Sequence, residues 1–533
     1  MPMTASSPNS RSGSITGFAL PAGAVIALPL FLLLLTTNSG ASPLILLWFY
    51  VSGCAAVAIS LAFPSSFFVF LLSSFLFVGF IAKAIAHFVF GVQLIEPVST
   101  FTSQWDQALI FAASGLSGVC LANFMATLFP SFPNTLRASG TAHLANSVLG
   151  AFSVLIVCSI GMYWANYTFH ILRIGFPLGI DMDARIYAVA AFGIAWGSLL
   201  GGLTAVLWLI ELRGWPYAAL ILTATFLGLL ASISMGSRIQ LLLYVLAAVV
   251  VIALRRRQVR SWIAVGLAMG LAAFIFVASL AVVSFERTFD FSQTASGTSV
   301  PLPATPPEAS NDSNSAEASS TSEVPATPRA VPKPPALQET SLADKVETVT
   351  RNRSALQGLF RQLRNLAVMR WVGMEGVMTA AANSDRLSAD LFLKVMSEDP
   401  AAGSHAIYQE MSGNRYGHVE YYTFLTLPGP IGVASLSGSA MVVAAFMFAL
   451  TLAGHLVEWI AARSTQNLAA ASVTGVSLAY LTVQMGFPWT LLIYAIELLL
   501  SVMFLGAVWW ATKWLASSNG RVESTPVEPQ SLQ

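Results

Sequence analysis

The chain contains few charged residues for its length. Only 10% of its 533 residues are Asp, Glu, Lys or Arg, whereas 56% are hydrophobic, and the mean hydropathy is +0.71. This composition excludes an ordinary soluble domain and predicts a polytopic membrane protein. The net charge of +1 lacks the basic excess of a nucleic-acid-binding protein, so we expect no nucleic-acid partner.

Cysteines are also scarce. The three present, Cys54, Cys120 and Cys158, lie in apolar stretches where they act as small buried hydrophobes, so no disulfide framework or thiolate metal site is predicted. The sequence Asp181-Met182-Asp183 has the spacing with which nucleotide-sugar enzymes hold a divalent ion. Its predicted location outside the cytoplasm separates it from nucleotide sugars, and we expect neither a metal nor another cofactor.

What the chain has instead is a series of long apolar segments. A membrane-crossing helix needs about 20 mainly apolar residues, and on this scale we predict an all-α bundle of about 12 transmembrane helices. Nine precede a polar region and three follow it, at 17–37, 42–63, 66–91, 107–129, 141–165, 187–211, 215–234, 237–254, 261–284, 430–460, 466–486 and 489–513. The connections at Pro64, at Arg213 to Trp215 and at Met235 to Arg238 are short enough for a re-entrant pair to imitate two spans.

Orientation follows from the strongest basic cluster, Arg255-Arg256-Arg257 with Arg260. Its short loop is expected in the cytoplasm. Both termini are then cytoplasmic, and the polar region is periplasmic in the inner membrane of a bacterium. The predicted divisions are a tail (1–16), a bundle of about nine helices (17–284), a linker (285–340), a helical periplasmic loop (341–428), three further spans (429–514) and a second tail (515–533).

We call the polar region between the two groups of spans the island; it covers roughly 140 residues, from Phe285 to about Leu427. Its first part, 285–340, has nine prolines between Pro301 and Pro335 and is predicted to be a disordered linker. A basic amphipathic helix follows, with Leu356, Phe360 and Leu363 on one face and Arg353, Arg361 and Arg364 on another. It suits either a membrane interface or the outer ends of the spans.

Charged groups within the spans are candidates for function because they are costly in hydrocarbon. Lys83 and His87 lie four residues apart on one helical face, with Glu96 and Asp106 following as carboxylates able to pair with the lysine. Alternatively, Lys83 extends outward to the interface and His87 makes one interhelical hydrogen bond. Arg238 is placed at an outer turn, which suggests an anionic ligand.

Three further ionisable residues lie in the late spans. His455, Glu458 and Glu497 have no obvious basic neighbour in the sequence, so they are interpreted as packing contacts or as proton-relay candidates.

Three sequence stretches resemble the bacterial O-antigen and exopolysaccharide repeat-unit polymerases. They are Ser232 to Arg257, with "SISMGSR" before a Leu-rich span; "RWVGMEGVM" at Arg370 to Met378; and "YYTFLTLPGPIGVASLSGS" at Tyr421 to Ser439. The resemblance covers most of the membrane portion and excludes 291–340. Members have about ten to fourteen spans and arginine-bearing periplasmic loops late in the chain.

The resemblance implies a polymerase that joins polyprenyl-diphosphate-linked oligosaccharide repeat units at the outer leaflet. Arginine suits the departing diphosphate because its planar fork holds two oxygens at once. The implied diphosphate-binding residues are Arg238, Arg370, Arg361, Arg364, Arg415 and Lys83, and the implied general bases are Glu375, His418 and His87. The expected partners are this lipid-linked saccharide, membrane lipids, a chain-length regulator and a flippase.

Three alternatives stay open. An O-antigen ligase would transfer a finished glycan to a lipid acceptor. A transporter or flippase of lipid-linked saccharide also fits twelve spans with both ends inside. A non-enzymatic membrane scaffold would tolerate alanine at every external arginine.

Overall fold

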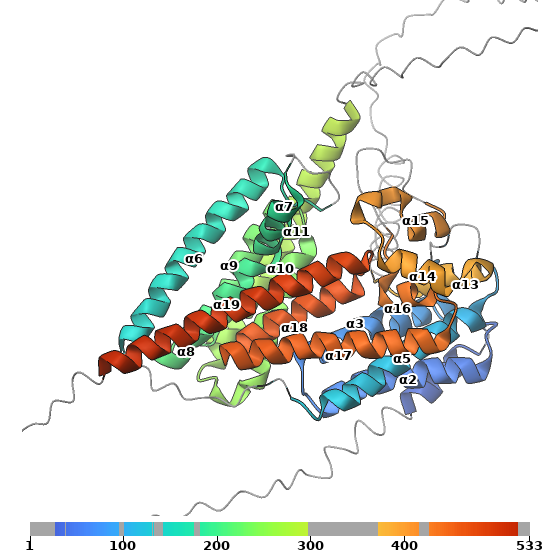
Figure 1. The fold of residues 1–533 in the computed structure, drawn as a ribbon, viewed down its shortest axis with the longest axis horizontal. Helices are drawn as coiled ribbons and strands as arrows, with labels where there is room; N and C mark the ends of the chain where they lie inside the picture. Colours follow the sequence, from blue (N-terminus) through green and yellow to red (C-terminus); the bar gives the residue numbers. More distant parts are fainter. Residues whose placement is uncertain are drawn as a thin grey trace, which may run out of the picture. The chain divides into compact units, whose positions relative to one another are not determined.

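The computed structural model describes residues 27–37, 39–94, 97, 101–130, 132, 142–174, 182–296, 371–414 and 426–520. These residues form helices and connecting turns, with no strand among them. Contacts divide the chain into one unit of residues 1–288 with 368–533 and another of 289–367. The described helices are drawn as coloured ribbons in Figure 1. Apart from the end of α11, they belong to the first unit.

Nine of the described helices are long and apolar enough to cross a membrane, which confirms an all-α membrane-embedded protein. They are α2 (Pro43–Ala62), α3–η1–α4 (Phe67–Leu76, Phe77–Ala82, Lys83–Phe88), α5 (Trp105–Ala126), α6 (Ala142–Phe169), α7–η2–α8 (Ala184–Phe192, Gly193–Gly197, Ser198–Arg213), α9 (Ala218–Met235), α11 (Trp262–Ser296), α17 (Ala440–Thr465) and α19 (Pro488–Gly520).

Two shorter apolar helices complete the predicted pattern, together with a helical stretch over 27–35. They are α10 (Arg238–Leu254) and α18 (Leu468–Val483). Each predicted span therefore contains helix. That all twelve cross the membrane stays a prediction, as does the orientation.

The short connections between spans are tight turns. Ser66 caps α3, because its side chain accepts a hydrogen bond from the Val69 amide. Gly214 and Gly236 end α8 and α9 with φ of 71° and 60°, a left-handed conformation that favours glycine. A short arginine-rich 3-10 turn, η3 (Arg256–Gln258), separates α10 from α11.

The centre of the bundle is α18, which contacts α3, α8, α10, α17 and α19. Nearly all of its side chains are buried. The helix contains four alanines, two serines and one glycine, small residues that allow neighbouring helices to approach closely. Gly475, for example, faces the backbone of Phe68. Buried polar contacts add to this packing: Asn467 donates to the Thr204 carbonyl and Ser472 to the Ala247 carbonyl.

The span predicted at 430–460 is wrong in its boundaries. It is divided into a short buried helix, α16 (Gly429–Ser435), and the long α17. Gly438 breaks the helix with φ of 72°, and Ser439 then caps α17 by accepting from the Val442 amide. Averaged hydropathy does not register this break, because both sides of it are apolar.

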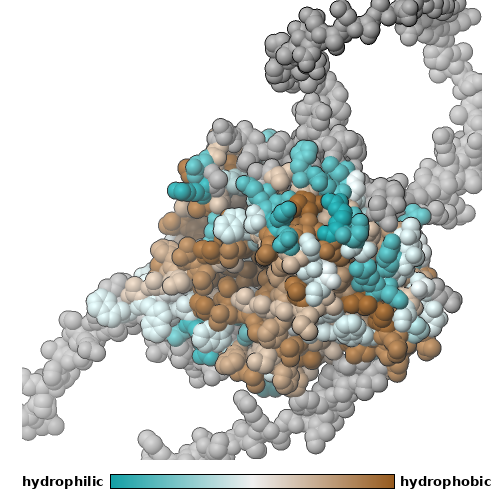
Figure 2. Space-filling model, turned by 45° about the vertical axis from the view of Figure 1, so that its right-hand side comes forward, coloured by the Kyte–Doolittle hydropathy of each residue, from teal (hydrophilic) through white to brown (hydrophobic). Residues whose placement is uncertain are grey.

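The described part of the island folds into short helices. They are α13 (Met374–Ala382), η4 (Ser384–Arg386), α14 (Ala389–Met396), η5 (Pro400–His405) and α15 (Ile407–Met411). Helix α11 continues to Ser296, so the beginning of the predicted linker is helical. The amphipathic helix predicted near Leu356 to Ala367 lies outside the described residues. Figure 2 shows one face, on which hydrophilic residues gather along one side of a largely hydrophobic surface.

Candidate functional site

A buried ion pair joins the third span to the island. The Lys83 Nζ lies 2.5 Å from Oε1 and 2.6 Å from Oε2 of Glu375, and it also donates to the Trp371 carbonyl at 2.5 Å. The two side chains are 1% and 13% exposed. Two of the candidates predicted from the sequence, Lys83 and Glu375, are thus brought together, and each uses the other as its partner.

Local backbone geometry brings the two segments close enough to pair. The six residues before Lys83 form the π-helical segment η1, a form frequent at functional sites. Gly79 in this segment lies against the carbonyl of Val372, and Gly373 lies against the backbone of Gly79. A side chain at either glycine would collide with backbone atoms. The Gly79–Gly373 contact therefore sets how near Glu375 comes to Lys83.

The island is built into the bundle and does not merely cover it. Helix α13 contacts both α5 and α16. Gly376 of α13 lies against the Pro428 carbonyl and Gly432, while Ile431 of α16 lies against Gly115. Gly115 is ten residues into α5, which is about 15 Å along the helix at 1.5 Å per residue. Residues 371–382 and 429–435 therefore pack between membrane helices.

Of the two carboxylates that the sequence offered as partners for Lys83, one has another role and the other is outside the described residues. Asp106 accepts a hydrogen bond from the Ser42 amide at 2.7 Å and joins the starts of α2 and α5. Glu96 lies outside the described residues. The alternative in which Lys83 extends outward is also wrong, because Lys83 is fully buried. Glu375, far along the chain, supplies the carboxylate.

His87 lies near Lys83 in the sequence but in a different environment. Its Nδ1 is 2.9 Å from the Val92 carbonyl, which only accepts, so this nitrogen is the donor. Its ring packs against Phe88 and Trp105. The predicted single hydrogen bond of His87 is present, although it runs to the adjoining loop and not to another helix. The histidine thus anchors an aromatic cluster at the end of α4.

Of the other predicted site residues, Arg238 is the one that lies among the described residues. Arg238 is the exposed first residue of α10, a helix that contacts α18, which in turn contacts α3. Arg361, Arg364, Arg370, Arg415 and His418 lie outside the described residues. In sequence, Arg370 directly precedes Trp371, whose carbonyl accepts from Lys83.

Glu458 has a structural role that the sequence did not specify. Its carboxylate accepts from the Ser66 hydroxyl at 2.5 Å and from the amides of Phe67 and Phe68 at 2.9 and 2.7 Å. These amides begin α3, where backbone donors have no partner within the helix and negative charge is favoured. The capping of one span by a carboxylate of another binds α3 to α17. The available signal in the sequence was a Glu within one apolar span and a Pro64-Ser65-Ser66 turn at the start of another.

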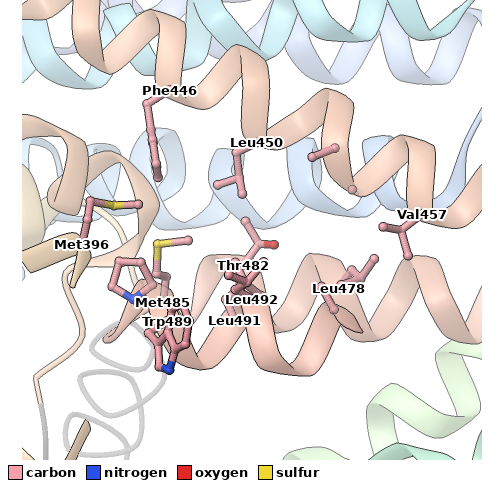
Figure 3. A pocket seen from close by; sticks show the side chains of 14 residues that line it. Met396, Phe446, Leu450, Val457, Leu478, Thr482, Met485, Trp489, Leu491 and Leu492 are labelled. Carbon is pink, nitrogen blue, oxygen red and sulfur yellow. The ribbon is translucent and has the colours of Figure 1, made fainter. Parts of the chain in front are cut away.

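A third feature, an apolar groove, was missed by sequence reasoning. It has a volume of about 420 Å³ and lies between α17 and α19, with α18 at its base (Figure 3). Its lining consists of Met396, Phe446, Leu450, Ala453, Gly454, Val457, Leu478, Thr482, Met485, Pro488, Trp489, Leu491, Leu492 and Ala495. Met396 comes from α14, so the groove extends from the spans to the island. No sequence motif predicts the groove, because its lining consists of the apolar residue types found on the surface of any membrane-spanning helix.

The described island also contains a perturbed carboxyl group. Burial raises the pKa of Glu398 above its ordinary value; the hydrogen bond from the Ile407 amide opposes this shift, and the nearby Glu410 adds to it. The Ile407 bond is 2.7 Å long. Glu398 therefore ties the turn after α14 to the start of α15, and none of these contacts supplies a compensating cation.

Among the residues that the structure describes, no three His, Cys, Asp or Glu side chains are grouped as metal ligands would be. Comparisons with protein-family models, with curated proteins and with solved structures give no match.

Proposed function

We propose that this protein is an integral-membrane polysaccharide polymerase that joins polyprenyl-diphosphate-linked repeat units at the outer leaflet of a bacterial inner membrane. The observation that carries the proposal is the Lys83–Glu375 ion pair, through which the island is held within the bundle. Such a reaction requires a polar site at membrane level, because the donor has a lipid tail and a hydrophilic saccharide. The stretch "RWVGMEGVM", one of those that resemble the proposed family, includes Glu375 and Trp371.

In the proposed reaction, a hydroxyl oxygen of the acceptor unit attacks the anomeric carbon of the donor. A new glycosidic C–O bond forms, the bond from the anomeric carbon to the diphosphate oxygen breaks, and the lipid diphosphate leaves with the bonding electrons. A general base takes the hydroxyl proton. Fixed positive charge at the leaving diphosphate supplies the largest expected stabilisation. Arg370, Arg238, Arg361, Arg364 and Arg415 are the proposed sources of this charge.

The geometry favours a positioning role for Lys83 over direct diphosphate binding. Its ammonium donates to Glu375 and Trp371 and is shielded from solvent. We propose that the pair holds the 371–376 segment, with Arg370 immediately before it, in a fixed place at the outer part of the bundle. Within this scheme Glu375 and His418 stay the first candidates for the general base, and His87 is the next.

Deletion of the gene and complementation with variants tests the proposal. We expect the deletion strain to lose polymer and to accumulate single lipid-linked repeat units on the periplasmic side, and Arg370→Ala with Arg238→Ala to reproduce this. Undiminished long chains in the double variant would contradict the residue assignment. Accumulation of finished lipid-linked polymer would instead identify a ligase, and units retained on the cytoplasmic side would identify a flippase.

A further inference from the structure

The groove between α17 and α19 opens toward the surroundings of the bundle. Two of its lining residues, Trp489 and Leu492, are 52% and 48% exposed, and Ala453 is exposed as well. Both walls, α17 and α19, are helices of membrane-crossing length. Only 22% of the apolar stretch of α17 and 17% of that of α19 is buried within the chain. The groove therefore faces hydrocarbon along at least part of its length.

Water is a poor occupant of this groove. The lining contains no charged side chain, and its polar side-chain groups are the Thr482 hydroxyl and the Trp489 indole N–H. Buried water needs two to four polar partners, which this lining does not supply. An apolar chain fits this lining better than water does.

The residues at the two ends of the groove indicate which kind of apolar chain it binds. In Figure 3 Phe446 and Leu450 point from α17 across the groove, and Met396 lies near its Phe446 end. Met396 and Phe392, four residues earlier on α14, face α17, where Phe392 contacts the Phe446 ring at 5.8 Å between centroids. One end of the groove thus lies against α14 of the island, while Glu375 lies on α13, earlier in the same part of the chain. The other end extends along Val457 and Leu478.

We propose that this groove seats the isoprenoid chain of the lipid-diphosphate substrate, with its diphosphate end toward α14. The inference rests on the proposed function for the identity of the lipid. Continuity with the island is what favours the substrate's tail over a bulk phospholipid chain, because only the substrate must bring its head group to the polar part of the protein. Trp489 lies at the same end, and indoles prefer the membrane–water boundary.

Photo-crosslinking distinguishes these occupants. A benzophenone amino acid replaces Phe446, a lining residue, or Ala445, the preceding exposed residue, which does not line the groove. The purified full chain is placed in phospholipid vesicles with mass-tagged polyprenyl diphosphate lacking a saccharide. We expect several-fold more polyprenyl adduct at position 446 than at 445, reduced by excess untagged polyprenyl diphosphate. Equal labelling at both positions, or phospholipid adducts alone at 446, would overturn the assignment.

A second pair of variants tests occupancy without a crosslinker. Ala453→Trp fills the groove, whereas Ala445→Trp adds the same bulk to an exposed position outside it. We expect Ala453→Trp to weaken polyprenyl diphosphate binding about tenfold, equivalent to about 1.4 kcal/mol, and Ala445→Trp to leave it unchanged. Equal affinities would reject the groove. Because binding needs no turnover, this result is independent of whether deletion of the gene abolishes polymer.

Discussion

Lys83 and Glu375 are 292 positions apart in the chain, yet their charged groups lie in contact and almost out of solvent. Opposite charges in a low-dielectric environment attract strongly, but removing one of them leaves the other without compensation. The pair is therefore a tie between the third span and the island that depends on both members.

Removal of one partner is expected to be worse than removal of both. Lys83→Met or Glu375→Gln should each lower the free energy of unfolding by about 3–5 kcal/mol, because a buried charge is left unpaired. The double variant Lys83→Met with Glu375→Gln should recover much of this loss. Thermal unfolding in detergent measures the effect, with Glu410→Gln, at an exposed position, as control. Additive losses in the double variant would mean that the groups act independently.

Glu458 should contribute more to stability than Glu211, a carboxylate near the end of α8. Glu458→Gln keeps one acceptor oxygen for the three donors at the start of α3, so at least one charge-assisted bond is lost, costing about 1.5–3 kcal/mol. Glu211→Gln is the matched control, because its contact with Arg255 is long, at 3.7 Å, and partly exposed. Equal unfolding temperatures for the two variants would argue against the cap.

Close glycine contacts should not tolerate a methyl group. A Cβ at Gly79 would meet the Val372 carbonyl, and one at Gly376 the Pro428 carbonyl. Because backbone atoms cannot rotate away, Gly79→Ala and Gly376→Ala should destabilise by about 3 kcal/mol, the upper part of the overpacking range. Gly266→Ala and Gly270→Ala have nothing within 4 Å of the added carbon. Protein yield and thermal unfolding should separate the two pairs, and similar behaviour would refute the packing.

Glu398 should make the folded protein less stable as pH rises. Its pKa is raised above the ordinary value of 4.5 in the folded state, so the folded form binds the proton more tightly than the unfolded form. The favourable contribution is therefore present below pH 4.5 and is lost as pH rises through the folded pKa. Glu398→Gln should flatten the change in unfolding temperature across this window and keep the bond from Ile407. An unchanged pH profile would count against the shift.

The orientation has its own test. A reporter active only outside the cytoplasm should be active when fused after Thr340 and inactive when fused after Arg257, because the basic cluster retains its loop inside. The reverse result would invert every span and place the island in the cytoplasm. The proposed outer-leaflet reaction would then fail with it.

Much of the fold could be predicted from the sequence because hydrocarbon imposes a local rule. Every backbone polar group within the membrane must be satisfied, so a sufficiently long apolar segment becomes a helix wherever it occurs. For that reason α2, α5 and α9 coincide with predicted spans to within a few residues. The break at Gly438 was not predicted, because the residues on both sides of it are equally apolar. It depends on a left-handed glycine followed by a capping serine.

The candidate site was predicted in part. Lys83 and Glu375 were each identified as unusual, one as a cation in a span and the other in an arginine-bearing stretch of the island. Their pairing was not, since local sequence contains no information on which carboxylate a buried lysine meets. The burial of α13 and α16 was likewise hidden, because short apolar helices look alike in a loop and in a bundle.

By itself, then, the sequence determined an all-α membrane protein, most of its helix boundaries and the residues whose charge needs a partner. These properties follow from the composition of short segments. Only the tertiary structure decided that Glu375 partners Lys83, that Glu458 caps α3, and that α17, α18 and α19 line an apolar groove. Each of these depends on contacts between distant segments, where close glycine packing and opposite charge select one arrangement among many.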